Sequence, residues 1–255
     1  MKELNDLLDA WPIIDFRPPP GFEPQASGSE TLTPVAPAPA AAKKSASSDD
    51  HDALSGMTFG ISYRDHAGEQ SRRTITCERA MDSPDGTVIL AHCHLREAIL
   101  AFPLEGIEAI TDYRTGETLG DPAGLLAAFG AGTSETPLGQ LIERTRASVR
   151  MLVHCANADG EFADAERDVI LDFIADAAAR APVIQGVSRD HLSRWINALN
   201  PTAEQLARDV AHVSGNAEEI ARLTKAMSHL IVADGDLADS EVLEMRKLLD
   251  AVKAR

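Results

Sequence analysis

One acidic phrase occurs twice in the chain, and this repetition restricts the C-terminal half to a fold that contains two similar helical hairpins. The phrase reads ADGEFADAE at residues 158–166 and ADGDLADSE at residues 233–241, 75 residues later. The match extends backwards and aligns His154 with His229. Glycine often follows a helix because it tolerates positive φ, and carboxylates favour the first turn of a helix. Each copy therefore predicts a helix, a break at Asp-Gly and a second helix that begins with acids.

Apolar residues recur at helical spacing from Leu138 to the end of the chain. This spacing predicts six helices, over residues 138–158, 164–181, 189–199, 201–214, 217–233 and 239–252. Ser188 is a predicted N-cap, Asn200-Pro201 is predicted to supply a cap and a first-turn proline, and Asn216 with Glu219 has capping-box spacing. Because the connections are short, residues 136–255 are expected to form an all-α bundle with an internal two-fold repeat.

Residues 53–125 have a different pattern, with short runs that favour strands. These runs lie at residues 59–63, 73–77, 87–92 and 107–113. Turn signals separate them, His66-Ala-Gly-Glu and Ser83-Pro-Asp-Gly. Short strands between such turns indicate a small barrel or a strongly bent sheet. The predicted fold class is therefore α+β, with a β segment followed by a helical bundle.

Residues 1–52 contain 8 of the 14 prolines and a low-complexity run, so we expect this segment to be disordered. Leu4, Leu7 and Leu8 have the spacing of one apolar helical face. The stretch WPIIDFRPPPGF concentrates apolar side chains between Trp11 and Phe22. Two interpretations of this stretch stay open: a fraying tail, or a short peptide that docks on a groove of this chain or another.

The charge of the chain argues against two classes of partner. The net charge is −16 and no segment is basic, so nucleic acid and anionic membrane surfaces are not expected partners. No stretch approaches the roughly 18 apolar residues of a membrane span, and no signal peptide is evident. Three widely spaced cysteines predict neither a disulfide framework nor a zinc finger, and they suit a reducing compartment. We expect a cytoplasmic protein with a protein partner or a homo-oligomeric state.

The repeated acids raise the question of a metal site. An EF-hand loop is excluded, because the positions of its first two ligands hold Cys155 and Asn157 in one copy and Leu230 and Val232 in the other. A site shared between the two copies stays open. Its candidate ligands are Asp159, Glu161, Glu166, Asp234, Asp236, Glu241, His154 and His229. The carboxylates suit calcium, magnesium or manganese, and the histidines shift the preference towards manganese or zinc, with zinc the weaker candidate. The alternative is that these acids only interact with helix dipoles.

The doubled motif with its flanking helices resembles the tellurite-resistance TerB domain, a relative of the N-terminal domain of the DjlA co-chaperone, over about residues 138–252. The resemblance implies a helical bundle with two-fold repetition, whose acids hold metal. The matching positions are Asp159, Glu161, Glu166, Asp234, Asp236 and Glu241.

The β segment has its own resemblance. ISYRDHAGEQSRRTI, followed by AHCHLREAILAFPLEGIEAITDYRTGE, resembles a WYL domain over about residues 57–120. This implies an SH3-like barrel that senses ligands, often beside DNA-binding domains in bacteria. The arginines that flank the phenylalanine in that family are replaced here by Leu100, Pro103 and Gly106. The remaining candidates for an anion site are Arg64, Arg73 and Arg96, although Arg96 fits a surface strand position equally well.

These observations lead to three functional hypotheses. The first is a non-enzymatic sensor or scaffold of bacterial stress response, linked to tellurite or metal, in which the bundle binds a divalent cation. The second is a ligand-responsive transcriptional regulator of WYL type. The third is a metal-dependent hydrolase, although no dinucleotide, Walker or nucleophile-elbow motif is present.

Overall fold

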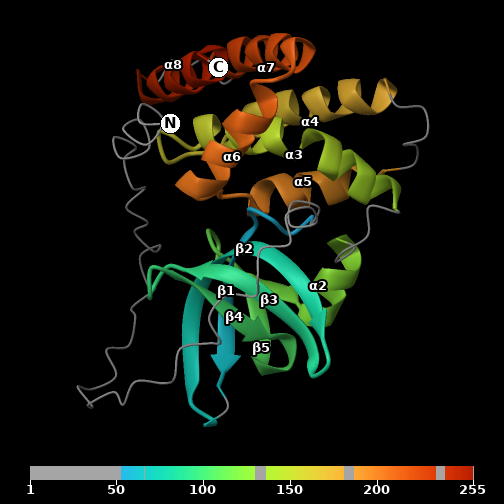
Figure 1. Ribbon diagram of the computed structural model, residues 1–255, viewed down its shortest axis with the longest axis vertical. Helices are drawn as coiled ribbons and strands as arrows, with labels where there is room; N and C mark the ends of the chain where they lie inside the picture. Colours follow the sequence, from blue (N-terminus) through green and yellow to red (C-terminus); the bar gives the residue numbers. More distant parts are fainter. Residues whose placement is uncertain (1–52, 66, 130–135, 181–186, 234–238, 255) are drawn as a thin grey trace.

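The computed structural model describes residues 53–65, 67–129, 136–180, 187–233 and 239–254. The predictions for residues 1–52 lie outside the described residues. A six-stranded antiparallel sheet precedes the seven described α-helices, so the α+β class is confirmed (Figure 1). The strands are β1 Thr58–Arg64, β2 Gln70–Ser83, β3 Gly86–Cys93, β4 Ala98–Pro103, β5 Ile107–Asp112 and β6 Thr118–Gly120, with a 3-10 turn η1 at Leu104–Gly106. The α-helices are α2 Pro122–Phe129, α3 Pro137–Ala156, α4 Asp164–Ala179, α5 Arg189–Ala198, α6 Ala203–Val213, α7 Ala217–Leu230 and α8 Asp239–Lys253.

The sheet has the strand order β4-β3-β2-β1-β5-β6. The long strand β2 pairs with β1 through its first half and with β3 through its second half, and its register with β3 shifts between Cys77 and Arg79. Such a bulge bends a strand and increases its twist. The sheet nevertheless stays open, because β6 has only three residues and pairs with β5 alone among the described strands. The closure expected of an SH3-like barrel is therefore absent from the described residues.

Alternation along the strands gives the sheet one buried face. Successive side chains of a strand point to opposite faces. The buried positions on this face of the central strands are apolar and include Phe59, Ile61, Ile75, Cys77, Ile89, Ala91 and Cys93. Thr58 and Thr76 are also buried, and their hydroxyls hydrogen-bond to each other at 2.7 Å. Turns at Gly68 and Gly86 have φ of 84° and 115°, which glycine adopts without steric cost. The two predicted turn signals are thus placed between the strands that they were expected to join.

All six predicted helices are present, with ends that differ from the prediction by one to a few residues. Asn216 is the N-cap of α7, and its side chain accepts hydrogen bonds from the N–H groups of Glu218 and Glu219. The predicted N-cap of α6 is wrong by two residues. Thr202, not Asn200, is the N-cap, and its hydroxyl accepts from the N–H of Gln205. Helix α2 and strands β4 and β6 were not predicted from the sequence.

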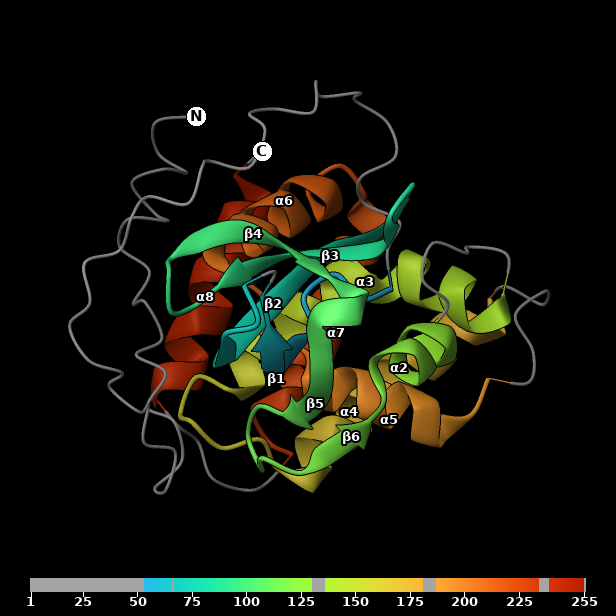
Figure 2. The same ribbon diagram turned by 90° about the horizontal axis from the view of Figure 1, so that it is seen from below.

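The helices stack in layers above the sheet (Figure 1). Helix α5 lies next to the sheet, and α7 and α8 form the layer farthest from it, whereas α2 lies beside the strands; the view from below shows the sheet in front of the helices (Figure 2). One hydrophobic cluster contains buried residues of both the sheet and the bundle. The two segments that the sequence divides at about residue 130 therefore share a core.

Polar contacts join the sheet segment to the bundle at buried positions. The Arg150 guanidinium on α3 donates to the Asp209 carboxylate on α6 and, at 2.9 Å, to the hydroxyl of Ser55. The indole N–H of Trp195 on α5 donates to the carbonyl of Ala53 at 3.2 Å, and the amide of Gln205 donates to the carbonyl of Cys77 at 3.0 Å. Buried polar groups need such partners. These bonds fix the position of α5 and α6 on the sheet.

Within the described ranges, none of the helices has the length and apolar character needed to cross a membrane.

Candidate functional site

The two copies of the acidic phrase each lie between two helices. The first copy falls between α3 and α4, and the second falls between α7 and α8. Gly160 of the first copy has φ of 92°, as expected for glycine after a helix. Asp234 and Asp236 of the second copy lie outside the described residues.

In the first copy, Asp159 and Glu166 accept hydrogen bonds from nearby backbone N–H groups. Asp159 and Glu161 are exposed, and the Asp159 carboxylate accepts from the N–H of Glu161 at 2.9 Å. Glu166 is buried, and its carboxylate accepts from the N–H of Ala163 at 2.7 Å, which satisfies one N–H at the start of α4. These contacts agree with the dipole and capping interpretation of the first copy.

A different arrangement is found where the end of α3 meets the start of α8. His154 Nε2 lies 3.5 Å from a carboxylate oxygen of Glu244, and both side chains are only 8% exposed. Glu241 lies one turn earlier on α8 and is 2% exposed. Lys247 donates to the other oxygen of Glu244 at 2.7 Å. This α3–α8 cluster, defined by His154, Glu241, Glu244 and Lys247, gathers acids and a histidine away from bulk water.

Cys155, next to His154 in the chain, has a thiol whose pKa is affected by this cluster. Its thiol is fully buried, and this burial raises its pKa well above the usual value. The carboxylates of Glu244 and Glu241 add to this rise, because they disfavour a thiolate nearby. Cys155 is therefore a neutral thiol rather than a thiolate ligand.

The two halves of the repeat differ at this point. His229, which the sequence aligns with His154, is exposed. At the spacing of 75 residues, the position of Glu244 is held by Val169 in the first half, and the position of Cys155 is held by Leu230 in the second. The described residues therefore place His154 and Glu241 in one cluster, while His229, Asp159 and Glu161 face solvent.

Sequence reasoning missed Glu244. A usable signal was present, since Glu241 and Glu244 are three residues apart and such pairs share a face of a helix. Glu244 has no counterpart in the first half, so a search guided by the repeat could not find it.

The donor set of the α3–α8 cluster fits part of a metal site. One imidazole and two carboxylates are ligands that manganese and zinc accept. Among the described residues, however, no group of three or more histidine, cysteine, aspartate or glutamate side chains is close enough to hold a metal ion. His154 and Glu244 are thus two potential ligands, and they do not form a complete site with the other described residues.

The three arginines proposed for an anion site take different positions on the sheet. Arg64, at the end of β1, forms an ion pair of 2.6 Å with Glu108 on β5. Arg73 donates to the hydroxyl of Ser71 at 3.2 Å, within the same strand. Arg96 is exposed in the turn between β3 and β4. The charge of Arg64 is compensated by Glu108. These contacts do not indicate an anion site shared by the three arginines.

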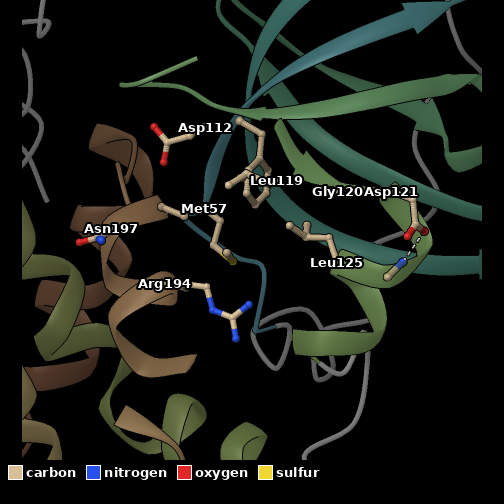
Figure 3. A pocket seen from close by; sticks show the side chains of 11 residues that line it. Met57, Asp112, Leu119, Gly120, Asp121, Leu125, Arg194 and Asn197 are labelled. Carbon is tan, nitrogen blue, oxygen red and sulfur yellow. Dashed lines mark hydrogen bonds between the residues drawn. The ribbon is translucent and has the colours of Figure 1, made fainter. Parts of the chain in front are cut away.

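A hollow lies between the sheet and the bundle, with a volume of about 250 Å³ (Figure 3). We call it the β6–α5 groove. Its walls come from β1, β5, β6, α2 and α5 and include Met57, Phe59, Leu119, Leu125 and Arg194. The side chains of Met57, Leu119 and Leu125 are turned towards one another across it (Figure 3).

Comparisons with protein-family models, with curated proteins and with solved structures find no match to this chain.

Proposed function

We propose that this protein is a non-enzymatic sensor or scaffold of metal stress, and that its helical bundle binds a divalent cation at the α3–α8 cluster. The observation that carries the proposal is the convergence of His154 with Glu244, 3.5 Å apart and buried, beside the buried Glu241. The bundle would be a divergent member of the TerB type, and the sheet an open relative of the WYL barrel.

The charge of the cluster favours a cation. Glu241 and Glu244 are both shielded from water, and both lie close enough to Cys155 to raise the pKa of its thiol. Two buried carboxylates destabilise each other unless positive charge compensates them. Lys247 supplies one positive charge through Glu244. A divalent ion bound between these side chains would add positive charge beside both carboxylates, and the imidazole of His154 would favour manganese or zinc over calcium and magnesium.

Helix α3 links the cluster to the sheet. Arg150 and His154 are four residues apart and so lie on the same face of α3. Arg150 binds Asp209 on α6 and Ser55 beside the sheet, whereas His154 contacts Glu244 on α8. A cation that draws α8 against α3 would therefore act on the same helix face that holds the sheet.

The mechanism is a shift in population. A ligand that binds one conformation more tightly than another stabilises the first by its difference in binding free energy. Here the cation would stabilise the closed packing of α8 on α3. Val242 and Leu243 on the first turns of α8, and Val232 just after α7, are exposed apolar residues, and their arrangement would change with the packing of α8. They are the surface on which we place the protein partner.

Calorimetric titration with manganese, zinc, calcium and magnesium tests the proposal. The full chain should bind manganese or zinc, and Glu244→Gln should weaken binding about tenfold or more, because a neutral amide replaces a charged ligand. The matched control is His229→Gln, which alters the aligned but exposed histidine of the other half and should leave binding unchanged. Heat of equal size in the wild type and in Glu244→Gln, or no heat with any ion, would overturn the proposal.

The regulator hypothesis gains no specific support, since Arg64 is paired with Glu108. A gel shift at low salt separates the two hypotheses. Tight, salt-sensitive retention of DNA would contradict a scaffold with a net charge of −16.

A further inference from the structure

The β6–α5 groove has an apolar floor and an open side. Met57 and Phe59 are almost fully buried at its base, and Leu119 on β6 is 40% exposed at its edge. A large apolar side chain that stays exposed beside a hollow marks a binding surface more often than an isolated exposed leucine does. Burial of Leu119 by an occupant would remove this apolar surface from water.

The size of the groove decides between two kinds of occupant. Pockets for small molecules usually enclose about 300 to 1,000 Å³. At about 250 Å³ the β6–α5 groove is smaller than this range, but it has room for one or two large apolar side chains of a peptide. The size therefore favours a short peptide segment over a free metabolite.

One side chain of the groove, Arg194, can receive an acidic group near the apolar anchors. Arg194 on α5 is exposed, and its only described hydrogen bond is a long one from Nε to the carbonyl of Asp190, at 3.4 Å. The two aspartates of the groove already accept from backbone N–H groups: Asp112 from Arg114 and Thr115, and Asp121 from Gly124. Arg194 is thus the charged group of the lining that remains available for a ligand.

The N-terminal segment supplies this chemistry. Residues 11–16 read WPIIDF, in which the acid Asp15 lies among Trp11, Ile13, Ile14 and Phe16. The described residues begin at Ala53. The carbonyl of Ala53 accepts a hydrogen bond from Trp195 on α5, the same helix that carries Arg194. The 36 intervening residues, 17–52, can span at most about 120 Å, which is more than enough to reach the groove. Covalent linkage also gives a short segment an effective concentration of the order of millimolar.

We propose that residues 11–16 of the same chain dock in the β6–α5 groove, with apolar side chains against Met57, Leu119 and Leu125 and Asp15 beside Arg194. The docked segment covers the junction between sheet and bundle, so it is an intramolecular ligand that any partner of this surface must displace. The inference is independent of cation binding, because the groove contains none of the residues of the α3–α8 cluster.

Photo-crosslinking in the full chain tests the inference. A benzoylphenylalanine, itself large and apolar, replaces Leu119, which is 40% exposed at the edge of the groove, and peptide mapping locates the product. We expect a crosslink to residues 11–16 whose yield does not change on dilution. The control places the same group at Ile99 on the opposite edge strand β4, where the side chain is 54% exposed. Equal yields from the two positions, or a yield that rises with protein concentration, would overturn the proposal; the second result would assign the groove to a second copy.

Two sets of variants probe the contacts. Ile14→Asp should abolish the crosslink, whereas Leu4→Asp, outside residues 11–16, should not. Arg194→Glu should lower the yield about two- to fivefold, the range expected for an exposed ion pair, and Asp15→Lys in the same chain should restore it. Arg194 is exposed, so its replacement leaves the core intact. A crosslink that survives Ile14→Asp would contradict the proposed anchors.

Discussion

At the scale of single residues, His94 makes the free energy of unfolding depend on pH. Burial, together with the neighbouring His92, lowers the pKa of His94 to about 4, and its Nε2 lies 2.8 Å from the hydroxyl of Thr76. The unfolded chain binds this proton near pH 6.5, so the free energy of unfolding falls as pH falls from about 6.5 to about 4. The loss is at most about 3 kcal/mol, and less after screening of the partly exposed ring by water.

His94→Gln should remove this part of the pH dependence. Urea unfolding at several pH values from about 7 to about 4.5 measures it, as the difference between the variant and the wild type. The control His229→Gln alters an exposed histidine and should keep the wild-type slope. An unchanged slope in His94→Gln would show that the pH dependence comes from other groups.

Arg150 is the residue on which the junction of sheet and bundle depends most. It is 1% exposed and binds Asp209 and Ser55. Arg150→Met should lower the free energy of unfolding by about 3–5 kcal/mol, because the Asp209 carboxylate would be left buried without its cation. Arg150→Met combined with Asp209→Leu should recover much of this loss, since no charge is then buried. Denaturant unfolding measures both, and a single variant that costs less than the double variant would contradict the account.

Single residues show where sequence reasoning reaches its limit. The repeat drew attention to His154 and Glu241, which are both buried. It gave the same weight to Asp159 and His229, which are exposed. The aligned His154 and His229 are the same residue type in the two copies. Burial distinguishes them, and burial depends on contacts between α3 and α8 that are distant in the chain.

At the scale of one element, the start of α6 offers a measurable cap. Thr202 Oγ1 accepts from the N–H of Gln205, and the Gln205 side chain accepts from the N–H of Thr202 at 3.0 Å. Thr202→Ala should cost about 1 kcal/mol of stability, the usual value for an N-cap. Ser188→Ala is the matched control, because Ser188 is the N-cap of α5 but makes no side-chain capping bond. Thermal or denaturant unfolding compares them, and equal losses would contradict the role of the cap.

The long helices were predictable and the short elements were not. Helices α3 to α8 repeat apolar residues at helical spacing over 10 residues or more, so their local pattern is strong. Strand β4, with the sequence AILAFP, lacks alternation, and β6 has three exposed residues. Both form because β3 and β5 offer an edge to pair with, and this is a tertiary cause that local sequence does not contain.

At the scale of the whole molecule, the sheet and the bundle share one core. Trp195, Leu199 and Met57 meet at the junction, where Met57 and Leu199 form an isolated β-bridge. The sequence divides the chain by composition, but it does not show that apolar residues of the two parts pack together. A ligand bound in the bundle therefore adds to the stability of a unit that includes the sheet.

Thermal unfolding with and without manganese or zinc tests cation binding at the α3–α8 cluster most directly. At a free concentration of about 100 times its Kd, a bound cation adds about 2.7 kcal/mol, which corresponds to a rise in Tm of about 5–10 °C for a chain of this size. The account predicts this rise in the wild type and in His229→Gln, and its loss in His154→Gln and Glu244→Gln. A rise of equal size in all four proteins, or no rise in the wild type, would contradict cation binding at the α3–α8 cluster.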